Sequence, residues 1–221
     1  MITDPNTTID PLTGLVFGSG LYAEMEKLLA QAKEFSLLVM DIDNLSTLNR
    51  AFGLDAGDAV FRRLGQLIQT RFPKPAFAIR EKGDQFYVLL PSAAKEKAFL
   101  QAEDFRKKFC EVETIQTTDG KPLGQSISIG VSSYPEDGAN PGDIFRKADS
   151  ALLRAKKNGR NQVNLAREEK LMPKTSHYTQ AQLEKLSRLA DKINMNESAL
   201  LRDALDDLLQ KHGDLSISQT T

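Results

Sequence analysis

The sequence predicts a mixed α/β fold in which helices cover a mainly antiparallel sheet, followed by a small β-α-α unit. Up to about Leu165, short apolar runs of the buried-strand type alternate with segments of helical periodicity. After Pro173, one short polar extended segment precedes two amphipathic helices. These two patterns predict the following parts: a domain at 1–165, a linker at 166–173, a second domain at 174–212 and a flexible tail at 213–221.

The first predicted strand is residues 35–42 (FSLLVMDI), a continuous apolar run of the kind found in buried strands. Residues 57–71 then predict a helix, because their apolar side chains recur on one helical face. Segments 76–79 and 85–90 flank REKGD, which predicts a hairpin with Gly83 in the turn. The remaining predicted elements are helix 93–109, strand 125–134, helix 141–157 and strand 162–165.

The charge balance excludes one class of protein. The chain has 29 Lys and Arg against 30 Asp and Glu, so it is no polycation that binds nucleic acid through bulk charge. A single cysteine, Cys110, excludes a disulfide-stapled secreted fold and fits a reducing compartment. No run approaches 18 apolar residues and the N-terminus lacks the features of a signal peptide. We therefore expect a cytoplasmic protein with no membrane partner.

Carboxylates at strand ends are the first candidate site. Asp41 and Asp43 close the buried strand, and Asp84 lies in the predicted hairpin turn. Carboxylates placed in this way hold hard cations such as Mg²⁺, although strand-end aspartates are also common turn formers. The helix end at 155–161 (AKKNGRN) places two cations, Lys156 and Arg160, where they can meet one phosphate chain, or where they only complement a helix dipole.

Taken together, these segments resemble the GGDEF (diguanylate cyclase) family over roughly residues 10–165. Four segments carry the resemblance in the family's order: DPLTGL at 10–15, MDIDNLSTLNRAFGLDAGDAV at 40–60, REKGDQFYVLLP at 80–91, and SISIGVSSYPEDG with ADSALLRAKKNGRNQV at 126–138 and 148–163. The resemblance implies a palm-like sheet covered by helices that binds GTP with Mg²⁺ and joins two molecules into cyclic di-GMP.

The resemblance also implies roles for individual residues. Asp41 and Asp84 would be metal ligands, with the Ile42 carbonyl beside them. Asn49 and Asp58 would bind the guanine edge. Two cations would contact phosphates: Lys156 and Arg160.

Several positions depart from the family pattern. Lys82 replaces the first glycine of the signature pentapeptide, and Gln85 replaces its glutamate. A carboxamide neither accepts a proton near neutral pH nor neutralises a metal. Pro73 and Ala76 replace the arginine and aspartate of the family's product-inhibition site. These departures predict a degenerate domain with no catalytic residue and no significant cyclase activity, which retains a nucleotide cleft or only the remnants of one.

The second domain cannot bury a sufficient core by itself, because it consists of about 40 residues. Thr179 is a good N-cap for a helix whose stripe is Leu183, Leu186, Leu189, Ala190 and Ile193. A second helix follows, with an apolar face made of Leu200, Leu201, Ala204, Leu205, Leu208 and Leu209. Pairing of two copies through residues 174–212 would bury both faces, which predicts an intertwined homodimer.

Residues 173–212 resemble a ribbon-helix-helix DNA-binding domain, through the strand–Thr–QLEKL–LA–INMNESALLRDAL register. The resemblance implies that paired strands enter the major groove of double-stranded DNA. The residues implied in DNA binding are Lys174, Thr175, His177, Asn196 and Ser198. The alternative is a dimerisation module without DNA binding.

These observations favour a dimeric DNA-binding transcriptional regulator whose degenerate GGDEF domain senses a guanine nucleotide, with cyclic di-GMP as the favoured ligand. Two alternatives stay open at this point. One is an active or weakly active diguanylate cyclase dimerised by its C-terminal domain. The other is a scaffold in which the GGDEF fold serves as an interaction surface.

Overall fold

The computed structural model describes residues 8–18, 20–81, 83–111, 115–116, 122–167, 174–193 and 197–212. The chain divides into two compact units, Met1–Glu168 and Glu169–Thr221, and each is described by itself. Of the positions discussed above, Lys82, Asn196, residues 168–173 and the tail at 213–221 lie outside the described residues. No helix in the described ranges has the length and hydrophobicity needed to cross a membrane.

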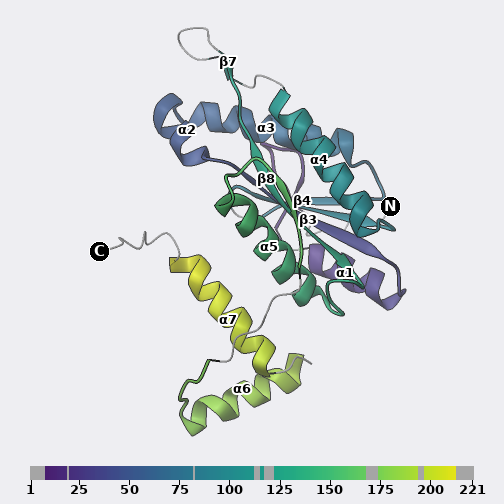
Figure 1. Ribbon diagram of the computed structural model, residues 1–221, viewed down its shortest axis with the longest axis vertical. Helices are drawn as coiled ribbons and strands as arrows, with labels where there is room; N and C mark the ends of the chain where they lie inside the picture. The colour runs from purple at the N-terminus through teal and green to yellow at the C-terminus, as the bar shows by residue number, and fades with distance from the viewer. Residues whose placement is uncertain are drawn as a thin grey trace. The chain divides into compact units, whose positions relative to one another are not determined.

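The first unit is built on a seven-stranded sheet of order β1-β2-β4-β5-β3-β8-β9 (Figure 1). Its central strands β4, β5, β3 and β8 are antiparallel, whereas β2 pairs with β4, and β9 with β8, in parallel. A separate pair is formed by β6 and β7. The strands are β1 Thr8–Ile9, β2 Val16–Phe17, β3 Phe35–Ile42, β4 Phe77–Arg80, β5 Gln85–Pro91, β6 Ile115–Gln116, β7 Pro122–Leu123, β8 Ile127–Tyr134 and β9 Val163–Leu165.

Helices cover both faces of this sheet (Figure 1). Successive side chains of a strand point to opposite faces, so β3 sends Leu38 and Met40 to one side and Leu37 and Val39 to the other. The first side is covered by α2, α3 and α4, and the second by α1 and α5. The helices are α1 Leu21–Ala30, α2 Leu45–Phe52, α3 Leu54–Arg71, α4 Lys95–Glu111 and α5 Pro141–Lys157.

Small residues on β8 allow α5 to lie close to the sheet. A Cβ added to Gly130 would overlap the backbone of Ala148 in α5. Its neighbours Ser128 and Ser132 point to the same face, and the Ser132 hydroxyl donates to the Ile144 carbonyl at 2.7 Å. This close packing brings the end of α5 to the end of β3, where the candidate site lies.

The predicted mixed α/β fold with a helix-covered sheet is confirmed. Strand 35–42 and helix 141–157 have the predicted bounds. Helix α1 and the short strands β1, β2, β6 and β7 were not predicted, because they are short or lack clear periodicity. The first unit also continues beyond residue 165, since buried Ala166 donates its amide to the Val131 carbonyl at 2.6 Å.

The second unit contains two helices, α6 Gln180–Ile193 and α7 Glu197–His212. Thr179 caps α6 as predicted: its hydroxyl accepts from the Gln182 amide at 3.3 Å, and the Gln182 side chain accepts from the Thr179 amide at 2.9 Å. The predicted strand at 174–178 is not formed in the described part of the chain. A strand needs a hydrogen-bonded neighbour, and no described strand pairs with this segment.

Candidate functional site

Two acidic residues predicted to bind a metal are brought together by strand register. Asp41 lies near the end of β3 and pairs with Gln85, the first residue of β5. Asp84 precedes Gln85 in the β4–β5 turn and is half-buried. Asp41 is 4% exposed. The hairpin therefore carries the second carboxylate toward the buried first one.

The ammonium group of Lys156 neutralises part of this charge. Asp41 points to the face covered by α5, and its Oδ2 lies 2.7 Å from Lys156 Nζ in the last turn of that helix. Burial raises the pKa of Asp41 to about 6; Lys156 opposes the shift, and Asp84 and Asp43 add to it. A predicted phosphate ligand and a predicted metal ligand thus form an ion pair with each other.

Asp43 has a structural role instead. Its Oδ1 accepts from the Ser128 hydroxyl at 2.7 Å, and its Oδ2 accepts from the Ser126 hydroxyl at 2.7 Å and the Asn161 amide at 3.0 Å. The side chain is buried. With both oxygens engaged, Asp43 joins the end of β3 to β8 and to the loop that follows α5.

Arg80 fixes the hairpin turn that carries Asp84. Its guanidinium donates to the Gly83 carbonyl at 3.0 Å and to Asp10 Oδ2 at 2.8 Å. It also lies over the Phe61 ring, 3.9 Å from the centroid. Asp10 is buried and accepts from the Thr13 hydroxyl at 2.7 Å. The DPLTGL segment and the hairpin are therefore connected through one arginine.

Gln85 is half-buried at the start of β5, and its Oε1 accepts from the Tyr87 hydroxyl at 3.1 Å. Burial raises the pKa of Tyr87, and the acidic side chains of Asp149 and Glu81 raise it further. Tyr87 therefore stays protonated and keeps donating. This bond fixes the orientation of the carboxamide, which presents no proton acceptor comparable to a carboxylate.

The predicted guanine ligands lie on neighbouring helices, Asn49 on α2 and Asp58 on α3. Asn49 Oδ1 is a buried atom that has no hydrogen-bond partner among the described residues. Its amide packs on Gly57, where an added Cβ would overlap Oδ1. Asp58 is half-exposed, and its Oδ2 lies 3.9 Å from the Arg62 guanidinium. A buried acceptor without a partner is suited to a ligand that donates hydrogen bonds.

Lys156 and Arg160 do not share a helical face. Helix α5 ends at Lys157, and Gly159, Arg160 and Asn161 all have positive φ angles. Arg160 is exposed, and its amide donates to the Ala155 carbonyl at 3.0 Å. The four-residue spacing would place both cations on one face only if the helix continued to Arg160. Instead the chain turns back after Lys157, and the Asn161 amide reaches Asp43.

The donor set fits a divalent cation held in part by a nucleotide. Two carboxylates, one of them buried with a raised pKa, place negative charge where a hard cation is favourable. Among the described residues, no group of three His, Cys, Asp or Glu side chains could hold a metal. Mg²⁺ commonly uses one or two carboxylates and takes its other ligands from phosphates and water. The site therefore fits Mg²⁺ that is bound together with a nucleotide.

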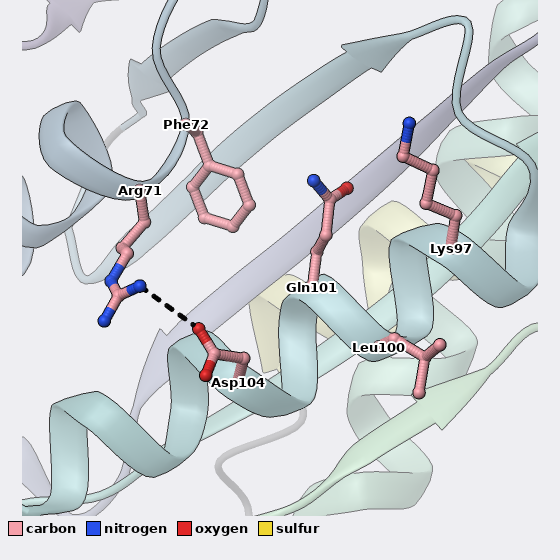
Figure 2. Close-up of a pocket in the computed structure, with 6 residues that line it drawn as sticks. All are labelled: Arg71, Phe72, Lys97, Leu100, Gln101 and Asp104. Atoms are coloured by element: carbon pink, nitrogen blue, oxygen red, sulfur yellow. Dashed lines mark ion pairs between the residues drawn. The ribbon is translucent and has the colours of Figure 1, made fainter.

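A cavity of about 380 Å³ lies elsewhere in this unit, between the end of α3 and the first half of α4 (Figure 2). An ion pair crosses it, with Arg71 Nη1 at 3.4 Å from Asp104 Oδ2. Gln101 also lines it. None of its lining residues belongs to the site described above.

The residues predicted to contact DNA are only partly placed. Lys174, Thr175 and His177 are exposed in the segment before α6, and Ser198 is exposed in the first turn of α7. The described part of the second unit contains no paired strands that could present these side chains. Their predicted alternation across a ribbon therefore stays a prediction.

Comparison with known proteins settles the family. Residues 7–162 match the family described as "Diguanylate cyclase, GGDEF domain", and the match covers more than half of the chain. The chain belongs to the GGDEF family. A diguanylate cyclase of Vibrio cholerae is 34% identical over 163 residues, which cover 72% of this chain and 50% of that protein. Diguanylate cyclase A of Treponema denticola is 36% identical over 132 residues, which cover 60% of this chain and 35% of that protein.

Solved GGDEF structures agree with this assignment. The coiled coil and GGDEF domain of DgcB from Caulobacter crescentus, in complex with c-di-GMP, gives a TM-score of 0.65 at 26% identity, covering 72% of this chain and 85% of that one. The active GGEEF domain of a Vibrio cholerae diguanylate cyclase gives 0.61 at 31% identity, covering 67% and 92%. The chain spans only about a fifth to a half of the length of the curated relatives it matches.

The prediction that this GGDEF domain is not an enzyme is wrong. Several of its relatives are named diguanylate cyclases, and one structural neighbour is an active GGEEF domain. The prediction weighted Gln85, Pro73 and Ala76 too heavily against the retained residues. Degeneracy of the domain is accordingly not shown by these departures.

Sequence reasoning missed three features of the GGDEF site. It did not assign Arg80 to the turn, Asp43 to a structural network or Lys156 to an ion pair with Asp41. A signal existed for Arg80, because an arginine directly before a hairpin turn can cap that turn's carbonyl groups. The other two depend on how closely α5 approaches β8, which the sequence shows only through Gly130.

Proposed function

We propose that this protein is a diguanylate cyclase, which converts two molecules of GTP into cyclic di-GMP. The supporting observation is the position of Asp84 beside the buried Asp41, on a fold whose family and relatives carry this activity. Because the chain spans at most about half the length of these relatives, the activity of the whole protein is part of the proposal.

The candidate residues fall into two groups, one that would bind the metal and phosphates and one that would bind the guanine base of the nucleotide. Asp41 and Asp84 would hold Mg²⁺, which supplies charge neutralisation and orientation of the triphosphate when bound. Lys156 would then be free to exchange its contact with Asp41 for a phosphate oxygen. Asn49 Oδ1, which has no partner among the described residues, would accept from the guanine edge, and Asp58 would accept from the same edge.

In each half-reaction the 3′-hydroxyl of one nucleotide attacks the α-phosphorus of the other. The new bond is O3′–Pα, the broken bond joins Pα to the bridging oxygen of the β-phosphate, and pyrophosphate leaves. The hydroxyl proton passes to solvent, because the carboxamide of Gln85 is held by Tyr87 and does not take it. Two such steps close the ring, and each uses a nucleotide from a different copy of the site.

The direct test is incubation of the purified full chain with GTP and Mg²⁺, followed by chromatographic measurement of cyclic di-GMP and pyrophosphate. We expect both products in a ratio of two pyrophosphates to one cyclic dinucleotide. Asp84→Asn should reduce the rate at least about 100-fold, since it removes a metal carboxylate. Absence of product from the natural sequence, at protein concentrations that support dimers, would refute the proposal.

Gln85→Glu sharpens the assignment of roles. A carboxylate at this position adds a proton acceptor, so we expect the rate to rise by about 10- to 100-fold if proton removal limits turnover. The rise should be larger at neutral pH than below the pKa of the new carboxyl group. An unchanged rate would show that position 85 does not take part in proton removal.

DNA binding by the second unit stays a prediction. The family match ends at residue 162, and the exposed residues Lys174, Thr175 and His177 are the only support within the described segment. A DNA pull-down that compares the natural protein with Thr175→Ala/His177→Ala tests it. Equal recovery of DNA by both proteins would exclude sequence reading by this segment.

A further inference from the structure

Two exposed apolar side chains lie at the corner between α2 and α3 (Figure 1). Phe52, the last residue of α2, is 38% exposed, and Leu54, the first residue of α3, is 74% exposed. Gly53 joins them with a φ of 83° and donates its amide to the Asn49 carbonyl at 2.9 Å. A ligand that covers both side chains would remove apolar surface from water, and this removal favours binding.

Helical spacing places each of these side chains beside a candidate guanine ligand. Phe52 comes three residues after Asn49 on α2. Leu54 comes four residues before Asp58 on α3. Residues three or four positions apart lie on the same side of a helix, about one turn from each other. The corner therefore combines two hydrogen-bonding side chains with an apolar neighbour for each.

The two polar side chains determine which kind of ligand fits this corner. Asn49 Oδ1 is buried and has no partner in the described part of the chain, and it packs closely on Gly57. The ion pair of Asp58 with Arg62 is long, at 3.9 Å, so the carboxylate retains capacity to accept. Both groups accept hydrogen bonds, so the ligand must carry N–H donors along one edge. Guanine carries such donors on one edge of a flat ring whose faces are available for apolar packing.

We propose that Phe52 and Leu54 form an apolar platform against which the guanine base of the bound nucleotide packs. The proposal rests on the proposed function, in which Asn49 and Asp58 bind the edge of the same base. Packing of a base on aromatic and apolar side chains depends little on which base it is, because every base has a flat face. The platform thus contributes affinity for the base, and the two polar side chains select guanine.

The platform should affect substrate binding more than the chemical step. It contacts the base, whereas the proposed metal ligands Asp41 and Asp84 act at the phosphates. Contacts that are equally strong in the ground state and in the transition state lower KM and leave kcat unchanged. Loss of the platform should therefore raise KM for GTP and preserve kcat at saturating GTP.

Calorimetric titration of the full chain with GTP in the presence of Mg²⁺ tests the proposal. Phe52→Ser/Leu54→Ser should raise the dissociation constant of GTP at least about 10-fold. Phe52→Tyr/Leu54→Met keeps an aromatic and an apolar side chain at the corner and should bind GTP like the natural protein. The matched control Leu100→Ser/Leu153→Ser changes two leucines of the first unit that are 66% and 52% exposed, and it should also leave GTP binding unchanged.

Thermal unfolding separates loss of the platform from loss of the fold. The unfolding temperature should stay that of the natural protein, since both changed side chains are exposed. If the double variant unfolds, Leu54→Ser alone provides the same test and should weaken GTP binding about threefold.

Each outcome bears on one proposal or on both. Unchanged GTP affinity in a folded serine variant would overturn the platform, as would a loss of affinity shared by Phe52→Tyr/Leu54→Met. A natural protein that shows the expected pattern of binding but forms no cyclic di-GMP would count against the proposed function alone. Formation of cyclic di-GMP with unchanged KM in the serine variants would count against the platform alone. Absence of GTP binding by the natural protein would overturn both.

Discussion

The two units of this chain differ in how they satisfy their apolar side chains. The first unit buries the central strands of its sheet between helices on both faces, and β3 is buried along its whole length. In the second unit, the leucines of two amphipathic helices are about half exposed. The first unit thus has a core of its own, which can hold the side chains of a site in fixed positions. In its described part, the second unit buries only Ala190 among its hydrophobic side chains.

The two units also differ in how many charged side chains they bury. Burying a charge costs desolvation free energy, so a fold tolerates it only where a rigid core holds compensating partners in place. The first unit holds Asp41, Asp43 and Lys95 in this way. Each is compensated: Asp41 by Lys156, Asp43 by three donors, and Lys95 by Glu136 and Asp137 at 2.8 Å. The second unit has no comparable buried charge in its described part.

The largest expected effect tests the core of the first unit. Phe105 on α4 is fully buried and packs against Phe72 at 5.1 Å between ring centroids. Phe105→Ala should lower the free energy of unfolding by about 3–5 kcal/mol. Leu205→Ala should change the unfolding transition of the first unit by less than about 0.5 kcal/mol, because this side chain belongs to the second unit. Urea unfolding followed by fluorescence and circular dichroism measures both, and similar losses would end the distinction between the units.

The next effect separates Asp43 from the proposed metal ligands. Asp43→Ala removes the acceptor of three hydrogen bonds and leaves buried donors unpaired. We expect a loss of about 3 kcal/mol in the free energy of unfolding. Asp84→Asn, at the half-buried turn, should change stability by less than about 1 kcal/mol while reducing cyclase activity. Thermal unfolding of the two variants in parallel decides between these roles, and a stability loss confined to Asp84→Asn would reverse them.

A smaller effect is expected at the cap of α6. Thr179→Ala removes the hydroxyl that accepts from the Gln182 amide. The second unit should lose about 1 kcal/mol of stability, and the first unit should lose none. Thermal unfolding followed by circular dichroism can detect the change as a lower unfolding temperature of the helices α6 and α7. A shift in the unfolding of the first unit would show that the two units are energetically coupled.

The smallest effect concerns pH. Burial acts to raise the pKa of Asp10, but hydrogen bonds from Thr13 and Arg80 outweigh it and hold the pKa below its ordinary value of 3.8. An acid with a depressed folded pKa stabilises the fold above its unfolded pKa, and that stabilisation is lost as the pH falls through the folded pKa. Asp10→Asn should therefore destabilise the protein at pH 6 more than at pH 3. An equal difference at both pH values would exclude a charged Asp10–Arg80 pair.

Sequence patterns predicted the architecture better than the contacts of the site. The apolar run at 35–42 and the periodicity at 141–157 reflect local burial, which a linear pattern records directly. The pairing of Asp41 with Lys156 depends on the approach of α5 to β8, a long-range feature. The weight given to Gln85 was wrong for a related reason. Departures at Lys82, Gln85, Pro73 and Ala76 are local changes, and a list of such changes does not show whether the remaining site keeps its activity.

The central claim is that the β3–β5 register makes one Mg²⁺-dependent GTP site from Asp41 and Asp84. Calorimetric titration of GTP, with and without Mg²⁺, tests it most directly in the full chain. The natural protein should bind GTP at least about tenfold more tightly with Mg²⁺, and Asp84→Asn should lose most of that difference while keeping its fold. Equal GTP affinity with and without Mg²⁺ in the natural protein, or an unchanged Mg²⁺ effect in Asp84→Asn, would contradict the claim.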